Sequence, residues 1–119
     1  MPRSVLIVDD DGEFRDLARR VLTSWGHVVI AEAGTCGEAL RLARELQPDT
    51  ALVDLGLPDG DGFTLTEQLQ ASGWPGQVIL ISTDADPANA AAAGRVGAAG
   101  FLPKDELAGR VLRQLIETG

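Results

Sequence analysis

Five side chains that could handle phosphate stand directly after short apolar runs of the chain. They are Asp9, Asp10, Asp54, Ser82 and Lys104. In an open parallel sheet, functional groups collect at the carboxyl ends of the strands. If the apolar runs are parallel strands, these carboxylates, the hydroxyl and the ammonium meet at one edge of the sheet.

Asp54 is the best candidate for a nucleophile among the carboxylates. It follows an apolar strand and precedes a Gly-Leu-Pro turn, so it does not open a helix as a capping residue would. Phosphoryl transfer needs a nucleophile held in line, a metal that absorbs charge, and further cations or donors. Asp54, a divalent cation, Lys104 and Ser82 would supply those parts, whereas Asp11 is expected only to cap the first helix.

Several carboxylates within a few ångströms of one another also predict a metal site, because they repel each other unless a cation neutralises them. With a few oxygen ligands only, the metal is expected to be Mg²⁺, with Mn²⁺ as the alternative. The chain has one histidine, His27, which is too few for most zinc sites. Its one cysteine, Cys36, is expected to be a structural thiol without a catalytic base.

The elements that must position these residues alternate regularly along the chain. Apolar runs separated by amphipathic segments indicate a single doubly wound (βα)5 domain of the α/β class. Its five-stranded parallel sheet is expected to have the order 2-1-3-4-5, with helices on both faces. Strands are expected at 5–8, 28–30, 51–54, 78–81 and 99–102, and helices at 13–25, 35–46, 61–71, 87–96 and 106–117.

Helix ends and faces follow from individual residues. Thr35 is a predicted N-cap, and Glu38 completes a capping box with it. The arginines of the first helix, among them Arg15, are expected to point away from its apolar face. Val111 is expected on the apolar side of the last helix.

Composition restricts the possible partners. Eighteen acidic against ten basic residues give a net charge of −8, which disfavours direct contact of this domain with nucleic acid or anionic membranes. No segment approaches the roughly 20 apolar residues that span a bilayer, and the N-terminus lacks a signal-peptide pattern. A length of 119 residues fits one domain, and the protein is predicted to be cytoplasmic.

Four sequence blocks, taken together, resemble the signature of response-regulator receiver domains from two-component signal transduction. The blocks are Val8-Asp9-Asp10-Asp11, Val53-Asp54 continuing through Gly62, Ile81-Ser82-Thr83, and Gly100-Phe101-Leu102-Pro103-Lys104. Their order and separation make the resemblance specific, and it covers residues 1–119 as one receiver domain.

The resemblance implies roles for the metal-binding residues. Asp54 would accept a phosphoryl group from the phosphohistidine of a histidine kinase. The carboxylates of Asp10 and Asp54 and the carbonyl of Gly56 would ligate Mg²⁺, while Asp9 would act through a metal-bound water. Such a domain is not a dedicated enzyme, although it catalyses its own phosphorylation and dephosphorylation.

The resemblance also implies a switch. Lys104 would pair with one phosphoryl oxygen, and Ser82 would reach toward another and draw its loop inward. Phe101 matches the aromatic position whose rotamer follows that hydroxyl; the alternative is a core phenylalanine. The implied partners are a sensor histidine kinase or phosphotransfer protein and an output domain or protein, with a homodimer as a further possibility.

Two features depart from the common family pattern, and a third bears on the lifetime of the phosphoryl group. Lysine follows proline at Pro103-Lys104-Asp105, which leaves the isomer of the Lys104–Asp105 peptide open. Phe101 lacks the hydroxyl of a tyrosine, so switching would depend on ring packing. Gly56 has no side chain to position water near Asp54, and slow self-dephosphorylation is therefore expected.

Three other interpretations compete. Asp9-Asp10-Asp11-Gly12 superficially fits the start of haloacid-dehalogenase-like phosphatases, but their second acidic motif and cap need more chain. A receiver-like binding module that works without phosphorylation would keep the fold but not the chemistry. The acidic turn at 59–62 resembles part of a calcium loop, but the required later glutamate is missing, and a turn capping the third helix is the better interpretation.

Overall fold

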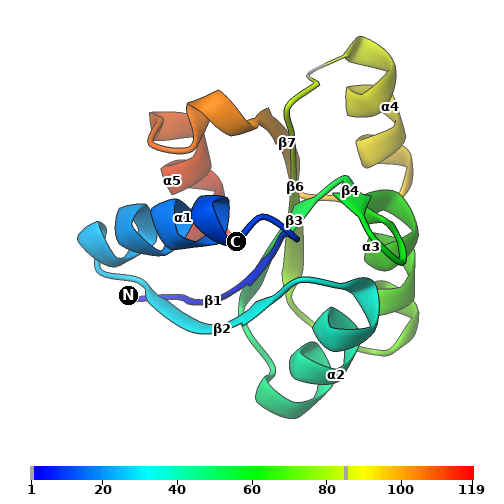
Figure 1. The fold of residues 1–119 in the computed structure, drawn as a ribbon, viewed down its shortest axis with the longest axis horizontal. Coiled ribbons are helices and arrows are strands. Elements are labelled where there is room, and N and C mark those ends of the chain that lie inside the picture. The colour runs from blue at the N-terminus through cyan, green and yellow to red at the C-terminus, as the bar shows by residue number, and fades with distance from the viewer. Residues whose placement is uncertain (1, 85) are drawn as a thin grey trace.

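The chain alternates strands and helices around one parallel sheet (Figure 1), and the computed structural model describes residues 2–84 and 86–119. The elements are β1 Ser4–Val8, α1 Gly12–Ser24, β2 Val28–Ala33, α2 Cys36–Leu46, β3 Thr50–Asp54, β4 Gly56–Leu57, β5 Gly60–Asp61, α3 Gly62–Ala71, β6 Gln77–Ser82, α4 Pro87–Arg95, β7 Gly100–Pro103, the 3-10 turn η1 Lys104–Glu106, and α5 Arg110–Thr118.

The main sheet has the order β2-β1-β3-β6-β7, and all of its strand pairs are parallel. Counting only these five strands, this is the predicted order 2-1-3-4-5, which is confirmed. The two-residue strands β4 and β5 form a separate antiparallel ladder in the loop after Asp54. The chain therefore folds back on itself directly beside the end of β3.

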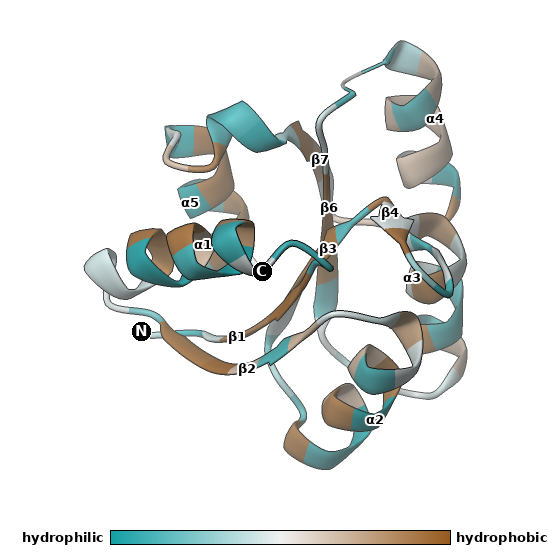
Figure 2. Cartoon of the chain, viewed as in Figure 1, coloured by the Kyte–Doolittle hydropathy of each residue, from teal (hydrophilic) through white to brown (hydrophobic). Residues whose placement is uncertain are grey.

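Helices cover both faces of the sheet. In Figure 1, α1 and α5 lie on one face and α2, α3 and α4 on the other. Each face has its own apolar cluster, and the central strands β1, β3 and β6 contribute buried residues to both. Figure 2 shows the matching pattern, with apolar central strands and more polar outer helix surfaces. Within residues 2–84 and 86–119, no helix is long and apolar enough to cross a bilayer.

Side-chain caps begin several helices as the sequence predicts. Asp11 accepts a hydrogen bond from the backbone N–H of Glu13 at 3.0 Å. Thr35 accepts one from the N–H of Glu38 at 3.1 Å, and the Glu38 carboxylate in turn accepts one from the N–H of Gly34. These bonds satisfy N–H groups that have no partner inside a helix, so they fix where α1 and α2 start.

The acidic turn at 59–62 is a capping turn. Asp61 is the N-cap of α3 and accepts a hydrogen bond from the backbone N–H of Thr64 at 2.8 Å. Asp59 accepts bonds from the backbone N–H groups of Cys36 and Gly37 at 2.7 and 3.1 Å. The turn thus joins the loop after Asp54 to the first turn of α2.

The last helix was predicted at 106–117, but the observed helix starts four residues later. Residues 104–106 form η1, and α5 begins only at Arg110. Gly109 adopts an extended conformation and separates the two elements, which lets Leu107 reach the core independently of α5. The buried residues of α5 are Leu112 and Ile116, whereas Val111 is 51% exposed, contrary to the prediction.

The structure gives the isomer of the Lys104–Asp105 peptide bond. No cis peptide bond occurs among the residues described, so the Lys104–Asp105 bond is trans. The proline at position 103 instead ends β7, where an edge strand tolerates the missing N–H. Lys104 follows as the first residue of η1 and turns toward the sheet edge.

Candidate functional site

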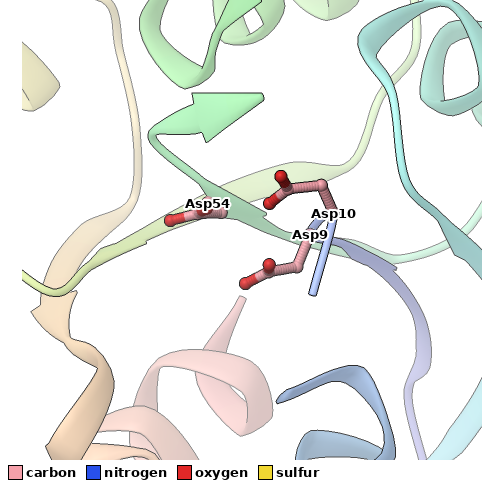
Figure 3. A group of neighbouring side chains, drawn as sticks. All are labelled: Asp9, Asp10 and Asp54. Carbon is pink, nitrogen blue, oxygen red and sulfur yellow. The ribbon is translucent and has the colours of Figure 1, made fainter. Parts of the chain in front are cut away.

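Three carboxylates gather where β1 and β3 end. Because Val8 pairs with Val53 in the parallel ladder, Asp9 and Asp10 lie beside Asp54. Carboxylate oxygens of the three residues lie within 4.8 Å of one another, and Figure 3 shows the side chains grouped at one edge of the sheet. Asp9 is fully buried, Asp54 is 8% exposed and Asp10 is exposed. This is the one group of at least three potential metal ligands in the described part of the chain.

The only lysine of the chain, Lys104, lies against this acidic cluster. The Lys104 Nζ atom lies 2.7 Å from Asp9 Oδ2 and 3.6 Å from Asp54 Oδ1. It also lies 4.5 Å from the centre of the Phe14 ring, a cation–π contact. The ammonium is therefore held between two anions and an aromatic face.

Burial and the neighbouring charges shift the pKa values of both Asp54 and Lys104. Burial and then the Asp9 charge raise the pKa of Asp54, although Lys104 opposes this. Burial disfavours the charged form of Lys104, but the carboxylates of Asp9 and Asp54 outweigh it and raise the pKa of the ammonium. Lys104 stays protonated at neutral pH and partly compensates the acidic cluster.

The donor set fits a hard divalent cation. Asp9 Oδ1 accepts a hydrogen bond from the Asp11 N–H at 2.9 Å. The buried Oδ2 atom is ion-paired with Lys104 but accepts no hydrogen bond of acceptable geometry from the described residues. Buried oxygen that lacks hydrogen bonds, beside two further carboxylates, matches the all-oxygen coordination that Mg²⁺ and Mn²⁺ prefer.

Ser82 lies next to the acidic cluster. Asp54 pairs with Ile81 across β3 and β6, and Ser82 is the next residue of β6. Its side chain is buried, and its Oγ atom accepts a hydrogen bond from the backbone N–H of Asp84 at 3.0 Å. Ser82 in turn pairs with Pro103, directly before Lys104. The sheet register therefore brings the predicted hydroxyl and ammonium to the same edge as Asp54.

Two further predicted residues flank this edge. Gly56 is the first residue of β4, and open space surrounds the position that a Cβ atom would take there. Its role as a carbonyl ligand stays a prediction.

Phe101 is half-buried in β7 and packs against the apolar cluster on the α2, α3 and α4 face. This contact explains Phe101 as a core residue, and its role as a switch stays a prediction.

Cys36 and His27 belong to other parts of the structure. Cys36 is buried at the start of α2, where burial and then the nearby Asp59 charge raise the pKa of its thiol to about 11. His27 accepts a hydrogen bond from the Arg3 N–H and lies 3.0 Å from a Glu117 oxygen. The two residues therefore form no Cys-His pair, as the sequence predicts.

Arg15 makes contacts that the sequence does not predict, although it was expected only to point away from the apolar face of its helix. Its Nη1 atom donates a hydrogen bond to the backbone carbonyl of Asp9 at 2.6 Å, and its Nε atom donates to Glu32 at 3.2 Å. Side chains on a helix lean toward its N-terminus, so an arginine in the first turn can reach the preceding loop. The direction of side chains on a helix could therefore have indicated this contact from the sequence.

Comparisons with known proteins agree with this geometry. The sequence model of the family described as "Response regulator receiver domain" matches residues 5–117. A probable transcriptional regulatory protein NarL of Mycobacterium tuberculosis is 34% identical over 114 residues, which cover 95% of this chain and 53% of that protein. The chemotaxis protein CheY of Bacillus subtilis is 29% identical over 118 residues, covering 99% of this chain and 98% of CheY.

A solved structure shows the same fold. The receiver domain of the M. tuberculosis response regulator NarL superposes with a TM-score of 0.86 at 35% identity, and 96% of each chain is covered. The chain spans about half the length of the NarL protein that it matches. On the family match over residues 5–117, the chain belongs to the response regulator receiver domains of two-component systems.

Proposed function

We propose that this domain is a phosphorylation-dependent switch in which Asp54 accepts a phosphoryl group from the phosphohistidine of a sensor histidine kinase or phosphotransfer protein. Receiver domains are signalling proteins rather than dedicated enzymes. The observation that carries the proposal is the position of Asp54, whose carboxylate lies within 4.8 Å of those of Asp9 and Asp10 and 3.6 Å from the Lys104 Nζ atom.

In this proposal, an Asp54 oxygen forms the new bond to phosphorus while the nitrogen–phosphorus bond of the donor breaks. Asp54 is held at the end of a fully buried strand, so its carboxylate needs little reorganisation. Lys104, 3.6 Å from Asp54 Oδ1, would pair with a phosphoryl oxygen. Ser82 would exchange its bond from the Asp84 N–H for one to another phosphoryl oxygen, and Phe101 would repack in response.

The metal ligands are proposed to be the carboxylates of Asp10 and Asp54 and the carbonyl of Gly56, with Asp9 acting through water. When bound, Mg²⁺ or Mn²⁺ neutralises charge on the oxygens of the transferring group. Asp9 is instead ion-paired to Lys104 at 2.7 Å, which supports an outer position for it. The full burial of the Asp9 carboxylate also argues against Asp9 as a phosphatase nucleophile.

Site mapping tests the proposal. The protein is incubated with phosphoramidate and Mg²⁺, the acyl phosphate is reduced with borohydride, and the peptides are analysed by mass spectrometry. The proposal expects the reduced residue at position 54. Reduction at Asp9 or Asp10 would contradict the assignment of the nucleophile.

Response regulators interact with sensor kinases and output domains. We infer that phosphorylation of Asp54 changes the affinity of this domain for an output domain, a separate protein or a second copy of itself. The net charge of −8 argues against direct nucleic-acid contact by this domain.

Replacing Gly56 with Asn is expected to shorten the lifetime of the phosphorylated form. The added side chain has open space and needs no unusual backbone conformation, and its amide can orient a water molecule toward the phosphoryl group. The rate of dephosphorylation should rise about three- to tenfold. It is followed by intact mass after the phosphodonor is removed. Gly94→Asn, an equally open position in α4, is the control, and equal rates in both variants would refute the expectation.

A further inference from the structure

Arg15 joins three segments around the acidic cluster. It lies in the first turn of α1, and its side chain is 26% exposed. Its Nη1 atom donates to the backbone carbonyl of Asp9 at 2.6 Å, and its Nε atom donates to Glu32 Oε1 of β2 at 3.2 Å. One guanidinium therefore links α1, the turn after β1, and the edge strand β2.

Two glycines lie close to the Arg15 guanidinium. Cβ atoms added at Gly12 and Gly34 would lie 3.5 Å from its Nη2 atom and 3.6 Å from its Nη1 atom, at van der Waals distance. The Asp9 N–H donates to the carbonyl of Ala33 at 2.9 Å. The Asp9 peptide groups are thus bonded to β2 on one side and to Arg15 on the other.

This arrangement opposes the repulsion within the acidic cluster. The turn after β1 carries Asp9 and Asp10, whose oxygens lie within 4.8 Å of those of Asp54. Like charges at that distance favour movement of the turn away from β3. A hydrogen bond from a charged donor to the Asp9 carbonyl resists that movement, because such bonds are stronger than neutral ones.

We propose that Arg15 is a positioning residue, which holds the turn after β1 so that Asp9 and Asp10 are prearranged for the divalent cation. The proposal rests on the proposed function, because it concerns the same metal site. The side-chain hydrogen bonds of Arg15 go to Glu32 and to the Asp9 carbonyl, not to the carboxylates of the acidic cluster. Arg15 acts through the backbone of Asp9.

The direction in which cation affinity changes when Arg15 is removed distinguishes a positioning role from a purely electrostatic one. Arg15 carries a positive charge near the site, so its removal should strengthen cation binding if charge alone mattered. If Arg15 positions the ligands, its removal should weaken cation binding, because groups that orient metal ligands strongly affect affinity. The two accounts therefore predict opposite changes.

Arg19 provides the matched control. It donates to the other oxygen of the same glutamate, Glu32 Oε2, at 3.0 Å, and it also pairs with Asp16. Its side chain is 46% exposed, and its side-chain bonds do not involve the turn that carries Asp9 and Asp10. Arg15→Ala and Arg19→Ala thus make the same change in net charge but only the first removes the bond to Asp9.

The test is Mn²⁺ binding, measured from the electron paramagnetic resonance signal of the free ion. Arg15→Ala is expected to bind Mn²⁺ about tenfold more weakly than the wild type. Arg19→Ala should stay within about twofold of the wild type, as for an exposed ion pair. Arg15→Lys keeps the charge but cannot reach Asp9 and Glu32 with a forked donor, so it too should bind more weakly. If Arg15→Ala does not fold, Arg15→Lys is compared with the wild type instead.

Activity gives a second readout. In phosphorylation with phosphoramidate, Arg15→Ala should need more Mg²⁺ for half-maximal rate, while its rate at saturating Mg²⁺ stays near that of the wild type. Unchanged or tighter Mn²⁺ binding in the folded Arg15 variants, or an equal loss in Arg19→Ala, would overturn the proposal. If the wild type binds Mn²⁺ but gains no phosphoryl group, the proposed function fails while the Mn²⁺ comparison still decides the role of Arg15.

Discussion

Replacing Lys104 with Met is expected to lower the free energy of unfolding by about 3 kcal/mol in metal-free buffer. The substitution keeps an unbranched apolar side chain over Phe14 but removes the ammonium that lies 2.7 Å from Asp9 Oδ2. Asp9 is fully buried, and the variant would leave its charge beside Asp10 and Asp54 without the neighbouring cation. A buried carboxylate without its counter-charge is costly.

Urea unfolding in the presence of a chelator measures this effect. Arg41→Met is the control, because it also removes one positive charge but from a side chain that is 56% exposed and, among the residues that the structure describes, is paired only with Glu45. A loss below about 0.5 kcal/mol is expected for the control. Added Mg²⁺ should restore part of the stability of Lys104→Met, since the cation would take over the neutralisation of the carboxylates. Equal losses in the two variants would show that Lys104 does not compensate the acidic cluster.

Replacing Asp54 with Asn is expected to have the opposite effect on stability. The substitution removes one of three neighbouring carboxylates and therefore part of the repulsion among them. At pH 7 without metal it should stabilise the fold by about 1–2 kcal/mol, because Lys104 already offsets part of that repulsion. The matched control is Glu67→Gln, which removes a negative charge from an exposed position of α3 and should change stability little.

The pH dependence of this gain follows from the pKa of Asp54. Burial and the Asp9 charge raise it above the ordinary value of 3.8, so the folded protein binds this proton more tightly than the unfolded chain does. The Asp54 contribution to wild-type stability therefore falls as the pH rises from about the unfolded value through the raised folded value. The advantage of Asp54→Asn should be small at pH 3.5 and reach its maximum above the folded pKa.

Chemical unfolding at a series of pH values, with a chelator present, measures that difference. Saturating Mg²⁺ should reverse the order, because the wild type has one more charged ligand for the ion. A gain in Asp54→Asn that does not depend on pH would show that the repulsion is not the cause.

The strand ends made most of the candidate site predictable from sequence. Asp54, Ser82 and Lys104 follow apolar runs, and parallel strands bring such positions to one edge whatever the details of packing. The register then fixes the neighbours, since Asp54 pairs with Ile81 and Ser82 with Pro103. The alternation of strands and helices predicted the parallel sheet, and the order 2-1-3-4-5 was expected because it is the usual arrangement for a chain of this size.

The parts that could not be predicted depend on contacts between distant segments. Arg15 reads as a residue on the outer face of its helix, and only the packing of α1 beside β2 brings it to Glu32 and Asp9. Asp59 reads as a turn residue, and its bonds to the first turn of α2 depend on where that helix lies. The start of α5 was placed too early because the apolar pattern continues through Leu107, while Gly109 breaks the helix without disturbing that pattern.

Intact mass after incubation with phosphoramidate is the most direct test of the central claim, that Asp54 accepts a phosphoryl group with the help of Mg²⁺. Wild type and Asp54→Asn are compared with Mg²⁺ and with a chelator. The account predicts a gain of about one phosphoryl group in the wild type with Mg²⁺ only, and no gain in Asp54→Asn. No gain in the folded wild type under any condition, or an equal gain in Asp54→Asn, would contradict it, and no gain would favour a binding module that works without phosphorylation.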